Sequence, residues 1–281
     1  MPTWKIGDVS VTHVVELQLP GLNFVIPDAV PEKLCTIPWL KAPFVNEDWE
    51  AIACIQTFVI ESQGQRVIVD TCVGNDKRFR LKHWNDRSGP YLQDLADAGF
   101  PADSIDTVLC THLHADPVGW NTTLKDGQWT PTFSGAKYLF GRVEWDHFKD
   151  LDEKQANDVR EQSVQPIVDA DLHTLVETNH NITDEVWLEP TPGHTPGHVS
   201  VHIKSDGKEA IITGDCIHHP SQMAHPEWTC AFDHDRTLAE TTRRGFLNQY
   251  ADKPTLIIGT HFAAASAGHI IRDGDVYRFE I

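Results

Sequence analysis

The chain has 281 residues, of which 40% are hydrophobic and 23% are charged, which is the composition of an ordinary globular protein. It carries 23 Lys and Arg against 41 Asp and Glu, a formal net charge of -18 at pH 7. Because a surface of this sign repels phosphates, we expect neither a nucleic-acid partner nor binding to an anionic membrane. The length fits one domain spanning residues 1–281.

The start of the chain and its cysteines indicate the compartment. Residues 1–5 (MPTWK) lack a basic segment followed by an apolar core, and no run of 18 apolar residues occurs. The six cysteines form no Cys-x-x-Cys pair, so neither a zinc ribbon nor a dithiol redox motif is indicated. We therefore expect a cytoplasmic protein with reduced thiols.

Hydrophobic patterning predicts strands and helices in both halves of the chain. In the first half, the predicted elements are strands at 9–15, 55–61 and 66–69, a helix at 91–98 and a strand at 106–111. In the second half, they are strands at 137–140, 185–189, 198–204, 209–213 and 255–260, and a helix at 236–250. Two strand-rich halves that each carry helices predict two sheets packed face to face with helices outside.

Two segments lack a clear place in these sheets. Residues 17–49 are rich in proline and large apolar residues and resemble an arm or lid. Such a segment would provide a dimer contact or an apolar substrate wall, and a long loop that packs on its own domain is an equal alternative. Residues 141–170 are polar and helical in pattern, and we expect them to cover the functional site.

The segment Thr111–Pro117 (THLHADP) follows a predicted strand. Residues two apart in an extended segment point the same way, so His112 and His114 can converge on one metal ion while Asp116 lies just beyond. Loops at the ends of strands are where functional sites collect.

Three further segments place metal-binding side chains after strands. They are Thr191–His198 (TPGHTPGH), Gly214–Asp215 and Gly259–His261 (GTH). His112, His194, Asp215 and His261 each lie just past the carboxyl end of a predicted strand, so a common sheet edge would gather them. The sequence therefore predicts a metal site at that edge.

The order of these four motifs resembles the metallo-β-lactamase superfamily over about residues 58–262. The resemblance implies an α+β fold, a four-layer αβ/βα sandwich of two mixed sheets with outer helices, with a dinuclear metal site between the sheets. Carried over by position, it assigns His112, His114 and His194 to the first metal, Asp116 and His261 to the second, and Asp215 as the bridge. It also places Asp70 near the site, where we expect it to orient a ligand by a hydrogen bond.

Pro117 departs from the family motif, which normally ends Asp-His with that histidine as a ligand of the second metal. Three outcomes are open: one metal at the three-histidine site, a weakened second site completed by water, or recruitment of His218 or His219, which would line the pocket. We expect a tight first site and a weak second one. Asp116 as N-cap with Pro117 at the first helical position is a favoured helix start, so the fold should survive.

The resemblance implies hydrolysis in which a metal-bound hydroxide attacks a lactone, ester or phosphoester, with Asp116 or Asp215 orienting it and accepting its proton. The local sequence of residues 118–122 and 214–220 resembles that of the lactonase and organophosphate-hydrolase branch of the superfamily. We expect one or two zinc ions per chain, with Fe or Mn as alternatives, a small-molecule substrate and a homodimer. His198 should support its loop instead of binding metal. A mononuclear iron oxygenase of the same superfamily and a non-catalytic metal-binding protein on the same fold remain alternatives.

Overall fold

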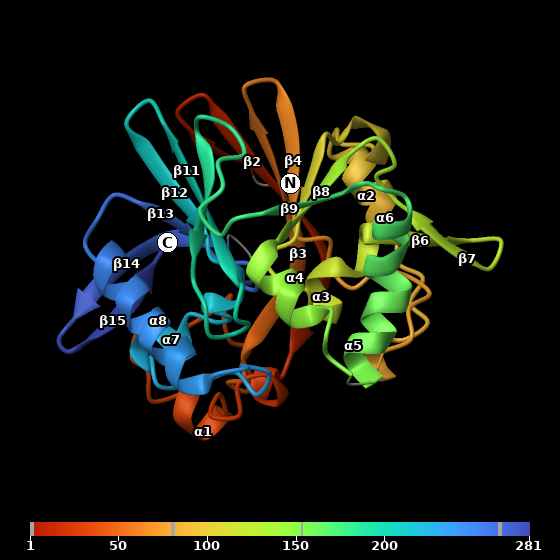
Figure 1. The fold of residues 1–281 in the computed structure, drawn as a ribbon. Helices are drawn as coiled ribbons and strands as arrows, with labels where there is room; N and C mark the ends of the chain where they lie inside the picture. Colours follow the sequence, from red (N-terminus) through yellow and green to blue (C-terminus); the bar gives the residue numbers. More distant parts are fainter. Residues whose placement is uncertain (1–2, 80–81, 153, 264–265) are drawn as a thin grey trace.

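Two mixed β-sheets lie face to face in the computed structural model, which describes residues 3–79, 82–152, 154–263 and 266–281 (Figure 1). The first sheet has seven strands in the order β1-β2-β3-β4-β5-β8-β9. Their bounds are Thr3–Ile6, Val9–Pro20, Ile52–Ser62, Gln65–Val69, Thr107–Leu109, Lys137–Gly141 and His173–Val176. Strands β1 to β4 pair antiparallel, and β4, β5, β8 and β9 pair parallel.

The second sheet has six strands in sequence order, β10 to β15. Their bounds are Val186–Pro190, Val199–Ser205, Lys208–Ile212, Leu256–Ile258, Ala267–Asp273 and Val276–Glu280. Only β12 and β13 pair parallel, so β10, β12 and β13 all run in the same direction. A separate hairpin consists of β6 (Thr122–Lys125) and β7 (Gln128–Pro131).

The helices are short, apart from α8 (Arg236–Tyr250). The others are α1 (Pro31–Leu34), α2 (Tyr91–Asp97), α3 (Ala115–Val118), α4 (Arg142–Phe148), α5 (Lys154–Val159), α6 (Gln165–Asp169) and α7 (Ser221–Ala224). Single turns η1 (Leu22–Phe24), η2 (Lys82–Trp84), η3 (Ala102–Ser104), η4 (Gly119–Asn121), η5 (Arg160–Val164) and η6 (Gly214–Cys216) connect them. Among the helices in the described part of the chain, none is long and apolar enough to cross a membrane.

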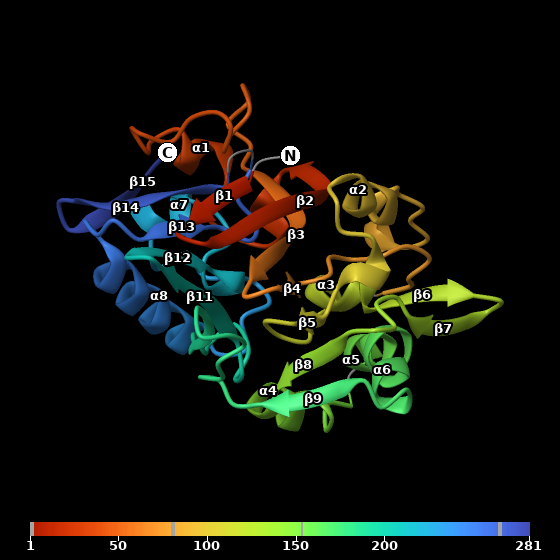
Figure 2. The same ribbon diagram turned by 90° about the horizontal axis from the view of Figure 1, so that it is seen from above.

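Alternating side chains build the layers between and outside the sheets. Val67 and Val69 of β4 pack into a buried cluster with Val199 and Val201 of β11, which joins the two sheets. Ile68, on the opposite face of β4, belongs to another cluster, which includes side chains of α2 and α6. The outer face of the second sheet packs against α8, and Figure 2 shows α8 and α2 on opposite sides of the two sheets. The expected sandwich of two mixed sheets with outer helices is confirmed.

The predicted elements occur close to their predicted positions, and the helix at 236–250 has the predicted bounds. The patterning missed β1, β6, β7 and β9, which have only four residues each, and the β14–β15 hairpin at the edge of the second sheet. In β14, Ala267 and Gly268 are both buried and Arg272 and Asp273 are both exposed, so burial does not alternate regularly along this strand. Strand β15 does alternate, with Tyr277 and Phe279 buried, and was overlooked despite this signal.

Residues 17–49 cover one end of the sandwich. Leu34, Leu40 and Phe44 are buried in the same cluster as Phe246 and Leu247 of α8. The segment therefore packs on the second sheet's outer layer, and its first part turns back towards the edge where the sequence predicts the metal site.

Candidate metal centre

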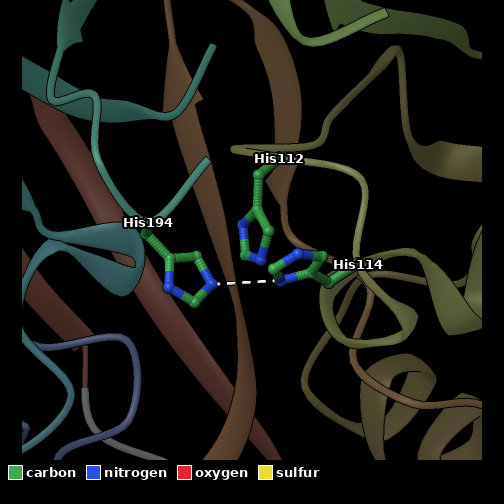
Figure 3. A group of neighbouring side chains, drawn as sticks. All are labelled: His112, His114 and His194. Atoms are coloured by element: carbon green, nitrogen blue, oxygen red, sulfur yellow. Dashed lines mark hydrogen bonds between the residues drawn. The ribbon is translucent and has the colours of Figure 1, made fainter. Parts of the chain in front are cut away.

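The loops after β5, β10, β12 and β13 meet at one edge of the sandwich and bring histidine side chains together. Figure 3 shows His112, His114 and His194 facing one another from two separate loops. One donor nitrogen from each ring lies within 4.8 Å of the other two. His114 Nδ1 is 3.1 Å from His194 Nε2. The structure thus places these three predicted ligands around a common point.

The protonation of this group fits a bound cation. Burial lowers the pKa of His112 well below its usual value and that of His114 to about 3, so both rings are neutral. His112 Nε2 is buried and has no hydrogen-bond partner among the described residues. An unpartnered buried nitrogen is costly. Burial opposes the charge of His194, but Asp215 and Asp233 outweigh it and raise the pKa of His194 well above its usual value, so a metal would displace a proton there. Three imidazoles are a donor set that zinc and similar divalent ions prefer, so the residues fit the metal that the sequence implies.

Asp70 orients His112 through an intervening threonine. It follows β4, and its carboxylate accepts hydrogen bonds from Thr111 N at 2.8 Å and from Thr111 Oγ1 at 2.9 Å. The Thr111 hydroxyl, whose proton is used towards Asp70, accepts from His112 Nδ1 at 3.1 Å. This chain directs the lone pair of His112 Nε2 into the centre. The expected hydrogen bond from Asp70 to a ligand therefore passes through Thr111.

Asp233 holds His194 in the corresponding way. Its Oδ1 accepts from His194 Nδ1 at 2.9 Å, which leaves His194 Nε2 free for a metal. Its Oδ2 accepts from Cys230 N at 2.8 Å. Asp233 lies in the loop after α7 and does not directly follow a strand. The search for metal-binding residues at the ends of strands therefore could not identify it.

Glu144, at the start of α4, joins the two histidine loops. Its Oε1 accepts from Leu113 N at 3.0 Å, and its Oε2 accepts from Gly197 N at 3.1 Å. Gly197 approaches so closely that an added Cβ would lie 2.2 Å from Glu144 N. Sequence analysis missed Glu144, although β8 also ends at this edge and the same strand-end argument would have pointed to it.

Asp215 lies at the centre of four histidines. Its Oδ2 is 3.3 Å from His194 Nε2, 3.2 Å from His218 Nε2 and 3.7 Å from His112 Nε2. Its Oδ1 is 3.0 Å from His261 Nε2. Burial alone would raise the pKa of Asp215, but the surrounding histidines hold it well below its usual value. Asp215 therefore stays ionised, in the position that the resemblance assigns to a bridging ligand.

Asp116 and His261 line the same cavity as Asp215. Burial raises the pKa of Asp116 to about 7. Burial opposes the charge of His261, but Asp215 outweighs it and raises the pKa of His261 to about 10. Asp116 and His261, the residues predicted to bind the second metal, therefore both have raised pKa values in the metal-free protein.

The segment around Pro117 contains the expected helix start and one additional turn before it. Helix α3 begins at Ala115 with His114 as its N-cap, and Asp116 has non-helical angles, φ -102° and ψ 114°. Asp116 thus separates two turns with the extended backbone of an N-cap, and Pro117 begins the second turn, as the sequence predicted. The kink has a steric cause, because a proline disfavours the helical conformation of the residue before it. Pro117 O accepts hydrogen bonds from Thr71 N at 2.6 Å and Thr71 Oγ1 at 3.0 Å, which fixes the loop.

Of the remaining histidines near the site, His198 and His219 hold loops in place through hydrogen bonds, and His218 lines the cavity. His198 Nε2 accepts from Asp215 N at 2.8 Å and its Nδ1 donates to Thr191 O at 3.0 Å, so its lone pair is already used. His219 Nε2 donates to Phe44 O at 2.9 Å, and its Nδ1 accepts from Ser221 Oγ at 2.8 Å. Of the two residues expected to line the pocket, only His218 belongs to the described cavity lining.

The centre forms one wall of a cavity of about 700 Å³. Its other walls are largely apolar and come from the end of β2 and the segment after it, from the helices after β8 and from the loop after α7. These side chains include Leu19, Leu22, Phe24, Val25, Phe148, Leu151, Val159 and Phe232. A cavity of this size that pairs apolar walls with a few polar groups is typical of a site for a small organic molecule.

Comparison with known proteins identifies a family and relatives that this chain resembles. A family model described as the metallo-beta-lactamase superfamily matches residues 55–261. An N-acyl homoserine lactonase from Bacillus cereus is 21% identical over 200 residues, which cover 66% of this chain and 73% of the relative.

Solved structures share the fold along nearly the whole chain. AidC, a dizinc quorum-quenching lactonase in complex with a product, superposes with a TM-score of 0.82 at 21% identity and covers 99% of this chain and 96% of its own. The hydrolase AbOPH gives 0.79 at 23% identity, with 99% and 95% covered. A probable metal-dependent hydrolase from Staphylococcus aureus gives 0.74 at 22% identity, with 99% of each chain covered.

Proposed function

The chain belongs to the metallo-β-lactamase superfamily and is a metallo-hydrolase, and we propose that its substrate is a small uncharged lactone, ester or phosphoester with an apolar substituent. The observation that carries the proposal is that three converging imidazoles border a cavity of about 700 Å³ with apolar side chains in its other walls. A divalent ion held by His112, His114 and His194 would polarise the substrate oxygen and lower the pKa of a water molecule to about 7.

Asp116 and Asp215 have different roles in this proposal. The pKa of Asp116, raised to about 7 by burial, suits a group that accepts a proton near neutral pH. Asp215 remains ionised because the histidines around it hold its pKa well below the usual value. We therefore assign proton acceptance to Asp116 and orientation of the attacking water to Asp215.

The walls of the cavity and the charge of the protein define the substrate class. Leu22 and Phe24 on one side and Phe148 and Val159 on the other provide apolar surface for an acyl or alkyl group. The net charge of -18 disfavours anionic substrates such as phosphate monoesters. The Bacillus cereus relative is an N-acyl homoserine lactonase, and an acylated lactone satisfies both requirements.

Hydrolysis of a substrate panel by the zinc-loaded protein tests the proposal. The panel contains N-acyl homoserine lactones of two chain lengths, an aryl ester and paraoxon, and kcat/KM is measured for each. We expect lactone hydrolysis that His112→Ala reduces by at least about a hundredfold. His225→Ala, which removes a half-exposed histidine paired with Glu227 outside the cavity, is the matched control.

No hydrolysis of any substrate by fully metal-loaded protein would contradict this function and support a non-catalytic binding protein. Iron as the bound metal, together with oxygen consumption in place of hydrolysis, would support the mononuclear oxygenase.

A further inference from the structure

A second group of donor atoms shares His194 with the three-histidine site. One ligand atom each from His194, His218 and Cys230 lies within 4.8 Å of the other two, and all three residues are buried. Cys230 has no exposed surface. A cysteine beside two histidines is a typical ligand set for zinc and other thiophilic divalent ions.

The loops that carry Cys230 and His218 are held in place by buried polar contacts. Asp233 accepts hydrogen bonds from both Cys230 N and His194 Nδ1, so one carboxylate positions two members of the group. Gln222 accepts from His218 N at 2.8 Å through Oε1 and donates to Trp228 O at 2.8 Å through Nε2. Gln222 therefore ties the His218 loop to the loop that leads into Cys230.

His218 has a spare nitrogen within this group. Its Nε2 contacts Asp215 Oδ2 at 3.2 Å, whereas its Nδ1 is buried and has no hydrogen-bond partner among the described residues. Its ring stacks on that of His261 at 5.5 Å between centroids and meets that of His194 edge-on at 5.2 Å. A buried nitrogen without a hydrogen-bond partner is costly unless a ligand binds there.

Cys230 is chemically suited to bind a metal, because the cysteine thiolate is a strong ligand of zinc and of other thiophilic ions.

We propose that Cys230 Sγ is a metal ligand and that His194, His218 and Cys230 form a thiolate-containing position for a divalent ion of the zinc class. Asp215 Oδ2, which lies 3.3 Å from His194 Nε2 and 3.2 Å from His218 Nε2, contacts the other nitrogen of the His218 ring, so His218 Nδ1 is the nitrogen left to bind the metal. Pro117 supplies no donor to a metal, whereas this group adds a sulfur and a further imidazole to the donors near His194.

The two positions compete for one ligand. Asp233 occupies His194 Nδ1, so only Nε2 is free, and one nitrogen lone pair binds one metal ion. A metal at the thiolate position therefore takes His194 from the three-histidine position. This inference rests on the metal-binding part of the proposed function and not on hydrolysis.

X-ray absorption at the zinc edge of the wild-type protein tests the inference without a substitution. At one zinc per chain, we expect a sulfur neighbour at about 2.3 Å. Coordination by nitrogen and oxygen alone would overturn the thiolate position while leaving the three-histidine site intact. Failure to bind any zinc would instead contradict the metal-binding function itself.

Cobalt(II) spectroscopy with variants identifies the sulfur. Wild-type protein should show a sulfur-to-cobalt charge-transfer band that Cys230→Ser loses, with the sulfur neighbour in the zinc spectrum lost as well. Cys216→Ser is the matched control, because Cys216 is also buried and follows Asp215 but belongs to none of the donor groups formed by the described residues. A sulfur signal that persists in Cys230→Ser, or that disappears in Cys216→Ser, would overturn the assignment.

Discussion

Replacing Glu144 by glutamine tests whether one buried carboxylate sets the geometry of both histidine loops. The carboxylate accepts from Leu113 N at 3.0 Å and from Gly197 N at 3.1 Å. Glutamine keeps one acceptor oxygen, but its amide group would face a backbone N–H, so one charge-assisted hydrogen bond is lost and one donor is left without an acceptor. A hydrogen bond to a charged group contributes about 1.5–3 kcal/mol, and a buried unsatisfied donor costs about 1–3 kcal/mol.

Because these two contributions overlap, we expect the free energy of unfolding of the metal-free protein to fall by about 2–4 kcal/mol. Zinc affinity should fall by about 10–100-fold, as when other residues that position metal ligands are replaced. Urea denaturation measures the first quantity, and competition with a coloured chelator measures the second. Glu177→Gln is the control, because Glu177 pairs with Arg142 at the surface and its side chain is 65% exposed.

If Glu144→Gln matches Glu177→Gln in both measurements, Glu144 does not hold the two loops. A loss of stability with unchanged zinc affinity would show that Glu144 supports the fold without positioning the ligands.

Three further predictions concern the same edge of the sandwich. Gly197→Ala should destabilise the protein by about 1–3 kcal/mol in thermal unfolding, because the added Cβ would clash with Glu144. Gly245→Ala is the control and should not destabilise the protein, because the space around Gly245 is open. Equal effects of the two substitutions would contradict this prediction. Pro117→His should raise bound metal towards two ions per chain by elemental analysis, and an unchanged ratio would refute the idea that Pro117 limits the second metal. His261, whose pKa rises from 6.5 to about 10 on folding, contributes stability that is fully present below pH 6.5 and lost as the pH rises through 10. The stability gap between metal-free wild type and His261→Gln should therefore shrink from pH 6 to pH 10 in urea titrations, and a gap that widens would count against the Asp215–His261 pairing.

The strand-end argument brought together the residues whose positions depend on sheet topology. His112, His194, Asp215 and His261 follow strands that end at one edge, and hydrophobic alternation is enough to find those strands. Asp233 and Cys230 could not be found in this way, because their positions depend on how the loop after α7 folds back across the cavity. Without a second cysteine close in the sequence, nothing marked Cys230 as a metal ligand.

The position of Pro117 explains why the loss of a family ligand leaves the first site well built. Pro117 O accepts from Thr71, the residue after Asp70, and Asp70 in turn holds Thr111 beside His112. The proline also forces Asp116 into an extended conformation, so the loop's shape is set by backbone sterics instead of by a metal. Preorganisation of this kind lowers the ordering cost of a metal that binds through His112. The competing thiolate position depends on side chains from separate loops, His218 and Cys230 among them, and its affinity therefore responds to substitutions far from residue 117 in the sequence.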